Sequence, residues 1–337
     1  MLKITLSRVV YQVTLEGPLL VESGNVITGD KKDLVVASGS TVYIYSPQND
    51  GYKQTSVLNL EQSILSLEVG FNVLDKNIIF VGTEDRIIAF GNVNGAITQL
   101  WQTDPEPGAN ISGITLADLD GDKREELAAI GRDNDTLYVY LLIGDNIASI
   151  QPQLLSIRQL PGPSRSITSF SPEPQRPRLL AIAYGANQAL SIVTYFLTET
   201  GFDQGPELVN LPYRITDLAG GNLLPDPGEE LVTAGNDGFV RIYTANNQLR
   251  LGLLTKNLGT TVSAVDTQMV TENTSLLVAG SPREFVFGFY SPGLTSEPDW
   301  AINVGGAVND LEIIDIDNVA VGTQNGILQV WEIKYPF

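Results

Sequence analysis

Residues 230–243 read ELVTAGNDGFVRIY, and this stretch decides the fold. An apolar run ends at Gly235, the turn-forming triplet Asn-Asp-Gly follows, and a second apolar run ends at Tyr243. An Asp-Gly pair between two runs rich in β-branched and aromatic residues is a strong short-range signal for a hairpin. The stretch therefore predicts two antiparallel strands joined by a tight turn.

The same pattern occurs seven times along the chain. An apolar run ends in a glycine in each copy, at Gly39, Gly82, Gly131, Gly185, Gly235, Gly280 and Gly322, and a second apolar or aromatic run follows within a few residues. A third apolar strand precedes the hairpin, as at Ile111–Leu116, and a more polar fourth strand follows it, as at Ala96–Thr103. Four strands repeated every 40–50 residues or so are typical of a β-propeller blade.

The last unit lacks its fourth strand, because the chain ends at Phe337 soon after the third. Residues Lys3–Leu15 alternate apolar with polar side chains and supply the missing strand. We therefore predict an all-β, seven-bladed β-propeller over residues 1–337, as one domain with four antiparallel strands per blade and the last blade closed by the N-terminal strand. The alternation slips after Arg8, which predicts a bulge near Ser7–Arg8. A solenoid or two stacked sheets is the rival architecture, but it leaves the split unit unexplained.

Composition excludes several classes of function. The chain has no Cys and no His, so it lacks thiolate zinc sites, Cys nucleophiles and the Ser-His-Asp arrangement. It has 39 Asp and Glu against 20 Lys and Arg, a net charge of −19. That charge disfavours a phosphate backbone and an anionic membrane surface. We expect no nucleic-acid partner and, without an apolar run of about 18 residues, no direct membrane insertion.

The N-terminal residues and the composition bear on the cellular location of the protein. The N-terminal residues MLKITLSRVVYQVTL alternate like a strand and lack the continuous apolar core of a signal peptide. The joint absence of Cys and His, with 2 Met, favours an extracytoplasmic or extracellular location over a cytoplasmic one.

Residues Asp118–Leu127, DLDGDKREEL, carry the clearest chemical motif. Acidic side chains occur at Asp118, Asp120, Asp122 and Glu126, and the backbone carbonyl of Arg124 falls at the odd-numbered position between the last two. Alternating oxygen donors around a glycine turn suit one hard cation such as Ca²⁺. The sequence predicts one calcium site here. A plain Asp-Gly hairpin turn with solvated acids is the alternative.

This loop resembles the FG-GAP or VCBS repeat of the integrin-α-like propellers. That family's motif is D-x-D-G-D-G-x-x-D-L followed by a β run ending in Gly, and the chain matches it at Asp118, Asp120, Gly121, Asp122 and Leu127. It departs at Lys123, where the family prefers Gly, and at Glu126, where it prefers Asp. The resemblance implies a calcium-binding blade loop on a propeller that serves as an interaction module.

Two other units contain degenerate versions of the loop. Unit one has GDKKDL at Gly29–Leu34, with Asp30 and Asp33, and unit five has PDPGEEL at Pro225–Leu231, with Asp217 far upstream. Their shared acid-Leu ending supports common descent of the units, while their ability to bind metal is left open.

Unit two contains DRIIAFGNVNGAITQLWQTD at Asp85–Asp104, which is similar to quinoprotein-like propellers in its Asn-Gly turn and following Trp101. An ordinary hairpin with a packed tryptophan is the simpler interpretation, and we expect Trp101, Trp300 and Trp331 to pack between blades. Propeller glycosidases use paired carboxylates across a central pocket, and this chain is rich in acids, so an enzyme of that kind is an alternative.

The function that these observations favour is a non-catalytic scaffold for protein–protein interaction with a calcium-stabilised blade loop. The negative charge favours a basic protein partner. The alternative is a carbohydrate- or quinone-type ligand-binding propeller, or an enzyme, that uses the central pocket.

Overall fold

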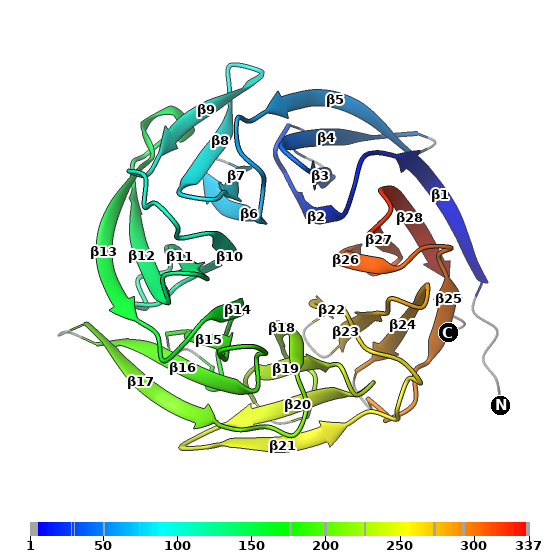
Figure 1. The fold of residues 1–337 in the computed structure, drawn as a ribbon. Helices are drawn as coiled ribbons and strands as arrows, with labels where there is room; N and C mark the ends of the chain where they lie inside the picture. Colours follow the sequence, from blue (N-terminus) through cyan, green and yellow to red (C-terminus); the bar gives the residue numbers. More distant parts are fainter. Residues whose placement is uncertain are drawn as a thin grey trace.

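The computed structural model describes residues 6–27, 29, 31–49, 51–73, 75–174, 177–198, 201–225, 227–271, 274–291 and 294–334. Within these ranges, 28 strands form seven four-stranded antiparallel sheets arranged as blades around a ring (Figure 1). The predicted seven-bladed propeller is confirmed. Among the described residues, no helix is both long enough and apolar enough to span a membrane.

The blades follow one another along the chain. Blade one contains β2 (Leu19–Gly24), β3 (Asp33–Ser38), β4 (Thr41–Gln48) and β5 (Gly51–Asn59), and blade two contains β6 (Ser66–Val73), β7 (Lys76–Gly82), β8 (Ile87–Val93) and β9 (Ala96–Gln102). Blade three contains β10 (Ile111–Ala117), β11 (Glu126–Gly131), β12 (Thr136–Ile143) and β13 (Gln151–Gln159), with the short 3-10 helix η1 (Ile147–Ser149) before β13. Blade four contains β14 (Ser164–Phe170), β15 (Leu179–Tyr184), β16 (Ser191–Thr198) and β17 (Gly201–Leu208). Blade five contains β18 (Ile215–Gly221), β19 (Glu230–Gly235), β20 (Val240–Ala245) and β21 (Leu249–Leu254). Blade six contains β22 (Ala264–Thr271), β23 (Thr274–Gly280), β24 (Phe285–Tyr290) and β25 (Trp300–Asn303), and blade seven contains β26 (Val308–Asp315), β27 (Asn318–Thr323), β28 (Ile327–Lys334) and β1 (Leu6–Thr14).

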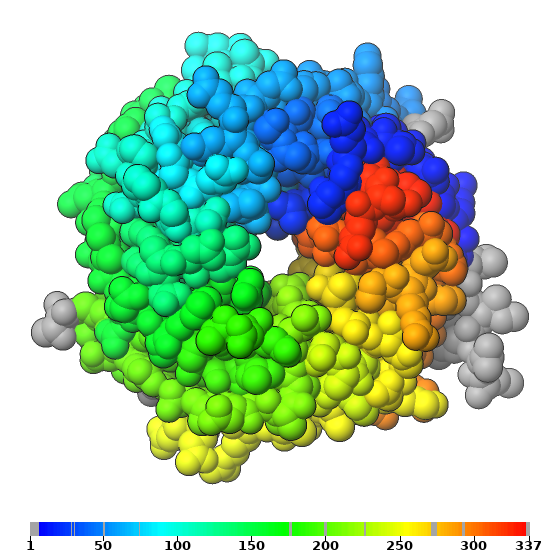
Figure 2. Space-filling view, viewed as in Figure 1, coloured from blue at the N-terminus to red at the C-terminus, as the bar shows by residue number. Residues whose placement is uncertain are grey.

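The first strand of each blade lines the centre of the ring. These inner strands contact one another in chain order, and β26 contacts β2 to complete the circle (Figure 1). The space-filling view shows an opening at the centre (Figure 2). The inner strands of adjacent blades therefore surround this central opening.

The apolar core lies between adjacent blades. The second strands β3, β11 and β19 are buried at every position, which explains their continuous apolar runs. The ring centroids of Trp101 in β9 and Phe80 in β7 lie 5.9 Å apart, in a cluster shared with blade three. Trp300 is buried in a second cluster, between blades six and seven, and Trp331 packs against that cluster. The predicted blade-packing role of the three tryptophans is therefore confirmed.

The N-terminal strand closes the ring as predicted. β1 pairs antiparallel with β28, with Val9 opposite Trp331 (Figure 1). The predicted bulge position was wrong, because the register shifts between Val9 and Tyr11 and not at Ser7–Arg8. Arg8 stays in register opposite Glu332, and their side chains form an ion pair.

Strand direction alternates within each blade. Connections from first to second strands and from third to fourth strands therefore emerge on the same side of the ring. We call this side the loop face; it includes the connections 118–125 and 144–150 of blade three and the turn residue Asn49 of blade one.

Candidate metal centre

The acidic loop, residues 118–125, joins β10 to β11 on the loop face. Backbone N–H groups of the loop donate hydrogen bonds to the aspartate carboxylates of the same loop, and these bonds fix its conformation. The backbone N–H groups of Gly121 and Lys123 donate to the two oxygens of Asp118, at 2.7 and 3.0 Å, and that of Asp122 donates to Asp120 at 2.9 Å. Such Asx turns are the usual way that aspartate forms a tight loop.

Two residues of the acidic loop have left-handed backbone conformations. Gly121 has φ +84°, which glycine adopts freely, and Lys123 has φ +72°, which costs a side-chain-bearing residue about 1 kcal/mol. The left-handed conformation at Lys123 gives a physical reason for a glycine at this position in the motif that the loop resembles.

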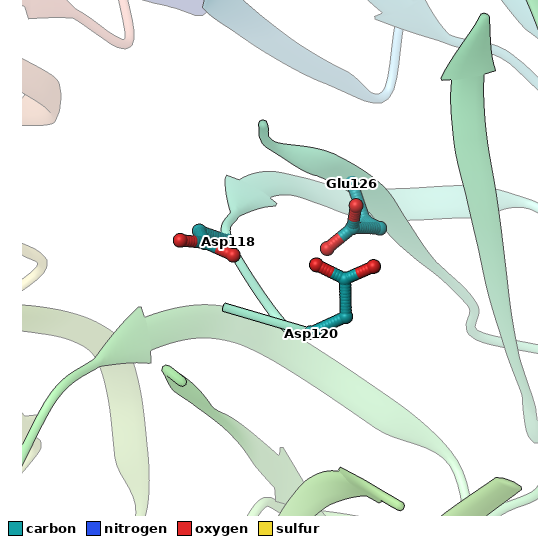
Figure 3. Close-up of side chains that lie close together, drawn as sticks. All are labelled: Asp118, Asp120 and Glu126. Atoms are coloured by element: carbon teal, nitrogen blue, oxygen red, sulfur yellow. The ribbon is translucent and has the colours of Figure 1, made fainter. Parts of the chain in front are cut away.

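Three of the predicted ligands come together. Carboxylate oxygens of Asp118, Asp120 and Glu126 lie within 4.8 Å of one another, and the side chains of Asp120 and Glu126 point toward each other (Figure 3). The Asp122 carboxylate is not part of this group, and the Arg124 backbone carbonyl remains a prediction. The Asp122 carboxylate accepts a hydrogen bond of 2.7 Å from the Arg124 backbone N–H, and the Arg124 guanidinium donates to the Gly144 carbonyl at 3.2 Å.

Glu126 is the buried member of the group. Its Oε2 accepts a hydrogen bond of 2.7 Å from the backbone N–H of Leu119. Burial, opposed by the Leu119 hydrogen bond and aided by the neighbouring charges of Asp120, Asp122 and Asp118, raises the pKa of Glu126 to about 7. A cation at this position would relieve the repulsion among the carboxylates. With oxygen atoms as its only donors, the group could hold a hard divalent cation.

The degenerate loops of units one and five show what the shared acid does. Asp33 accepts hydrogen bonds from the backbone N–H groups of Val26 and Ile27, and Glu230 accepts them from Leu223 and Leu224. Each acid therefore braces the loop that precedes its own strand. Asp30 and Asp226 lie outside the described residues, and among the described residues neither loop gathers three acids.

Sequence reasoning missed a second set of acids on the inner strands. Asp217, Asp266 and Asp310 each accept a hydrogen bond from the N–H of the following residue and another from the inner strand of the next blade. The second bonds join Val265 to Asp217 at 3.0 Å, Ile313 to Asp266 at 2.7 Å and Val21 to Asp310 at 2.9 Å. These three aspartates therefore link four neighbouring blades.

Glutamates occupy the same central opening. Glu22 of blade one interacts with Glu68 of blade two, with Glu312 and Asp310 of blade seven and with Asp266 of blade six, so these acids come from four consecutive blades. Burial and, to a smaller extent, repulsion from Glu125 and Asp266 raise the pKa of Glu68 to about 8. A single acid within an otherwise apolar inner strand, as in SLEVG at 66–70, is the signal that would have identified them.

Comparison with known proteins does not assign the chain to a family. No family model matches it, and no curated protein matches its sequence. The function proposed below rests on the geometry of the acidic loop and on the distribution of charge.

Proposed function

We propose that the chain is a non-catalytic interaction propeller of the FG-GAP/VCBS kind, in which a calcium ion stiffens the acidic loop of blade three. The observation that carries this proposal is the convergence of Asp118, Asp120 and Glu126 on the loop face. The motif positions that this loop shares with the repeat support the family relationship.

The donor set fits calcium. Ca²⁺ takes six to eight oxygen ligands from carboxylates, backbone carbonyls and water. Asp118, Asp120 and Glu126 would form the first part of such a shell, and we propose the Asp122 carboxylate and the Arg124 carbonyl as further donors. The ion would supply charge neutralisation and rigidity, because it would offset both the burial of the Glu126 charge and the smaller repulsion from the neighbouring aspartates.

A basic protein partner on the loop face is the second part of the proposal. The chain carries a net charge of −19, and Asp120 and Asp122 on this face are exposed. Loops on a rigid scaffold are common binding sites, and a surface of one charge speeds association with a partner of the opposite charge. Rigid blades would hold the partner-binding loops in a fixed arrangement.

Thermal unfolding in calcium and in chelator tests the metal site. Binding to the folded state alone stabilises by about 2.7 kcal/mol at a hundredfold excess of ligand over Kd. We expect calcium to raise the Tm of the wild type and to have no effect on Asp120→Ala/Asp122→Ala. Asp145→Ala, which removes an exposed acid of the next connection, is the matched control and should respond like wild type. Equal Tm values in calcium and chelator for the wild type would refute the calcium site.

Co-purification from the native source tests the partner. We expect a basic protein that elutes with increasing salt and binds less well to Asp120→Ala/Asp122→Ala. A glycan array on the same preparation addresses the central-pocket alternative. Sugar binding without any protein partner would favour that alternative over the scaffold.

A further inference from the structure

The acidic loop of blade three lies between blades two and four, and both of these blades contact it directly. On the side of blade two, the backbone N–H of Phe71 in β6 donates a hydrogen bond of 3.1 Å to Oε2 of Glu125. On the side of blade four, the backbone N–H of Arg178 donates to the Asp118 carbonyl oxygen at 3.0 Å. The conformation of the loop therefore depends on residues of two other blades.

Phe71 lies at an irregular place in blade two. The register of β6 against β7 shifts between Gly70 and Val73, so the regular ladder is interrupted at Phe71. Its φ of +54° is in the left-handed region, which is strained for a residue with a side chain. Its ring is buried in the apolar cluster shared by blades two and three. The Glu125 carboxylate thus supports a strained segment of backbone at the junction of these two blades.

The same two blades approach each other closely at the base of the loop. A Cβ atom on Gly70 would lie 2.5 Å from Cδ1 of Leu116, in the strand β10 that leads into the loop. This close packing fixes where the loop begins relative to Phe71.

Blade four holds the opposite side of the loop with an anchored residue. A Cβ atom on Gly121 would lie 3.3 Å from Cγ of Pro177, so the loop backbone packs against the proline ring. The neighbouring Arg178 is fixed by its guanidinium, which donates to Glu229 of blade five at 3.0 and 2.5 Å and to Ser169 Oγ at 3.0 Å. The hydrogen bond from the Arg178 N–H to the loop therefore comes from a residue that is itself held in place.

The two consecutive glutamates at the end of the loop point to different partners. Glu126 belongs to the group of three carboxylates with Asp118 and Asp120, whereas the Glu125 carboxylate binds Phe71 of blade two and is not in that group. Glu125 therefore contacts the neighbouring blade, and the next residue along the chain supplies a predicted ligand.

We infer that Glu125 is a positioning residue for calcium: its hydrogen bond to Phe71 holds the acidic loop in the form that presents the ligands. This inference rests on the calcium site proposed above and adds how its affinity is set. A loop that is already ordered loses less conformational freedom when an ion binds. Partners that orient metal ligands from outside the ligand set are worth about 10–100-fold in affinity. Because coupling is reciprocal, a bound ion strengthens the Phe71–Glu125 contact by the same factor.

Calcium titration of Glu125 variants by isothermal calorimetry tests the positioning role. Glu125→Ala removes the acceptor and should weaken calcium binding about tenfold. Glu125→Gln removes the charge but retains an acceptor oxygen for the Phe71 N–H, so its Kd should stay within about threefold of wild type. Asp145→Ala, which removes an exposed acid beside the loop, controls for the loss of negative charge and should bind calcium like wild type.

Hydrogen exchange of single amides gives a readout that a general loss of stability would not move selectively. We expect calcium to slow exchange of the Phe71 amide about tenfold in the wild type, since the coupling acts equally in both directions. The amide of Ile27, which donates to Asp33 of blade one at 2.6 Å, is the reference and should not respond. In Glu125→Ala the Phe71 response should disappear, while the Arg178 amide on the other side of the loop should still respond.

The outcomes separate this inference from the site on which it rests. If the wild type does not bind calcium, the site and the inference both fail. If a folded Glu125→Ala protein binds calcium with wild-type affinity, or if Glu125→Gln loses as much affinity as Glu125→Ala, the positioning role fails while the site stands. If Glu125→Ala does not fold, the wild-type exchange decides, because a Phe71 amide that calcium does not slow overturns the inference.

Discussion

Asp33, Glu126 and Glu230 occupy the same position in three blades, the first residue of the second strand. All three are buried, and each accepts backbone hydrogen bonds from the loop that precedes it. A buried carboxylate with such donors is stabilised, while the N–H groups would be left unsatisfied without it. At Glu126 the same brace also directs a carboxylate toward Asp118 and Asp120.

Glu230→Ala tests the bracing role away from the candidate metal centre. In the wild type, the backbone N–H groups of Leu223 and Leu224 donate to Glu230 Oε2 at 2.7 and 3.1 Å, and the substitution removes this acceptor. We expect a loss of about 2–3 kcal/mol in the free energy of unfolding by urea denaturation. Glu207→Ala changes an exposed side chain, and its free energy of unfolding should stay within about 0.5 kcal/mol of the wild-type value. A Glu230→Ala protein as stable as this control would show that the brace is dispensable.

At the scale of elements, β1 differs from every other outer strand because it comes from the opposite end of the chain. Its ladder with β28 is regular up to Val9, shifts at Val10 and continues to Thr14 opposite Ile327. Tyr11 packs against Tyr45 and Tyr52 of blade one, with ring centroids 5.7 and 5.8 Å apart. The bulged strand therefore joins blade seven by hydrogen bonds and blade one by aromatic packing.

Gly51→Ala should disturb this junction. The added Cβ meets the Val10 carbonyl at 2.9 Å, and the φ of +122° is unfavourable for alanine. We expect a destabilisation of about 1–3 kcal/mol, measured by thermal unfolding. Gly29→Ala is the matched control, since a Cβ atom there meets nothing within 4 Å. Equal Tm values for the two variants would contradict the close approach at the bulge.

For the whole molecule, closure depends on the N-terminal strand. Deletion of residues 2–15 removes β1, leaves β28 with an unpaired edge and uncovers the tyrosine contacts of blade one. Because open strand edges pair with other chains, we expect oligomers or aggregates by light scattering and a loss of cooperative unfolding. Deletion of residues 2–5 alone, which precede β1, is the control. A monodisperse, cooperatively folding 2–15 deletion would disprove this mode of closure.

The acids of the central opening predict how stability depends on pH. Burial raises the pKa of Glu68 to about 8, of Asp310 to about 7 and of Asp217 to about 6, above their values in the unfolded chain. Each acid then binds its proton more tightly in the folded state, so stability falls as the pH rises from about 4 to about 8. Asp85, Asp133 and Glu332 have lowered pKa values because of hydrogen bonds from arginine, so they lose their stabilisation only in stronger acid.

Thermal unfolding between pH 5 and 8 measures this effect. We expect Tm to be highest in mild acid and to decrease toward pH 8, by roughly 2–4 °C for each kcal/mol lost. The glutamine of the Glu68→Gln variant cannot ionise, so the Tm of this variant should decrease less than that of wild type as the pH approaches 8. A Tm that rises from pH 5 to 8, or a Glu68→Gln protein with the slope of wild type, would contradict the ionisation of buried acids in the ring.

The sequence by itself determined the seven blades, the split last blade and the acids of the loop at 118–126. Apolar periodicity, Gly-containing turns and the spacing of repeats are local properties, so they can be read along the chain. The position of the bulge could not be predicted, because it depends on the register of β1 against β28, a strand from the other end of the chain. Nor could the grouping of Glu126 with Asp118 and Asp120 apart from Asp122, which depends on backbone hydrogen bonds within the folded loop. Only the tertiary structure brings Glu22, Glu68 and Asp266 of three separate blades near one another and forms a pocket from residues of blades one, six and seven. Both depend on closure of the ring, which places residues far apart in sequence within reach of one another.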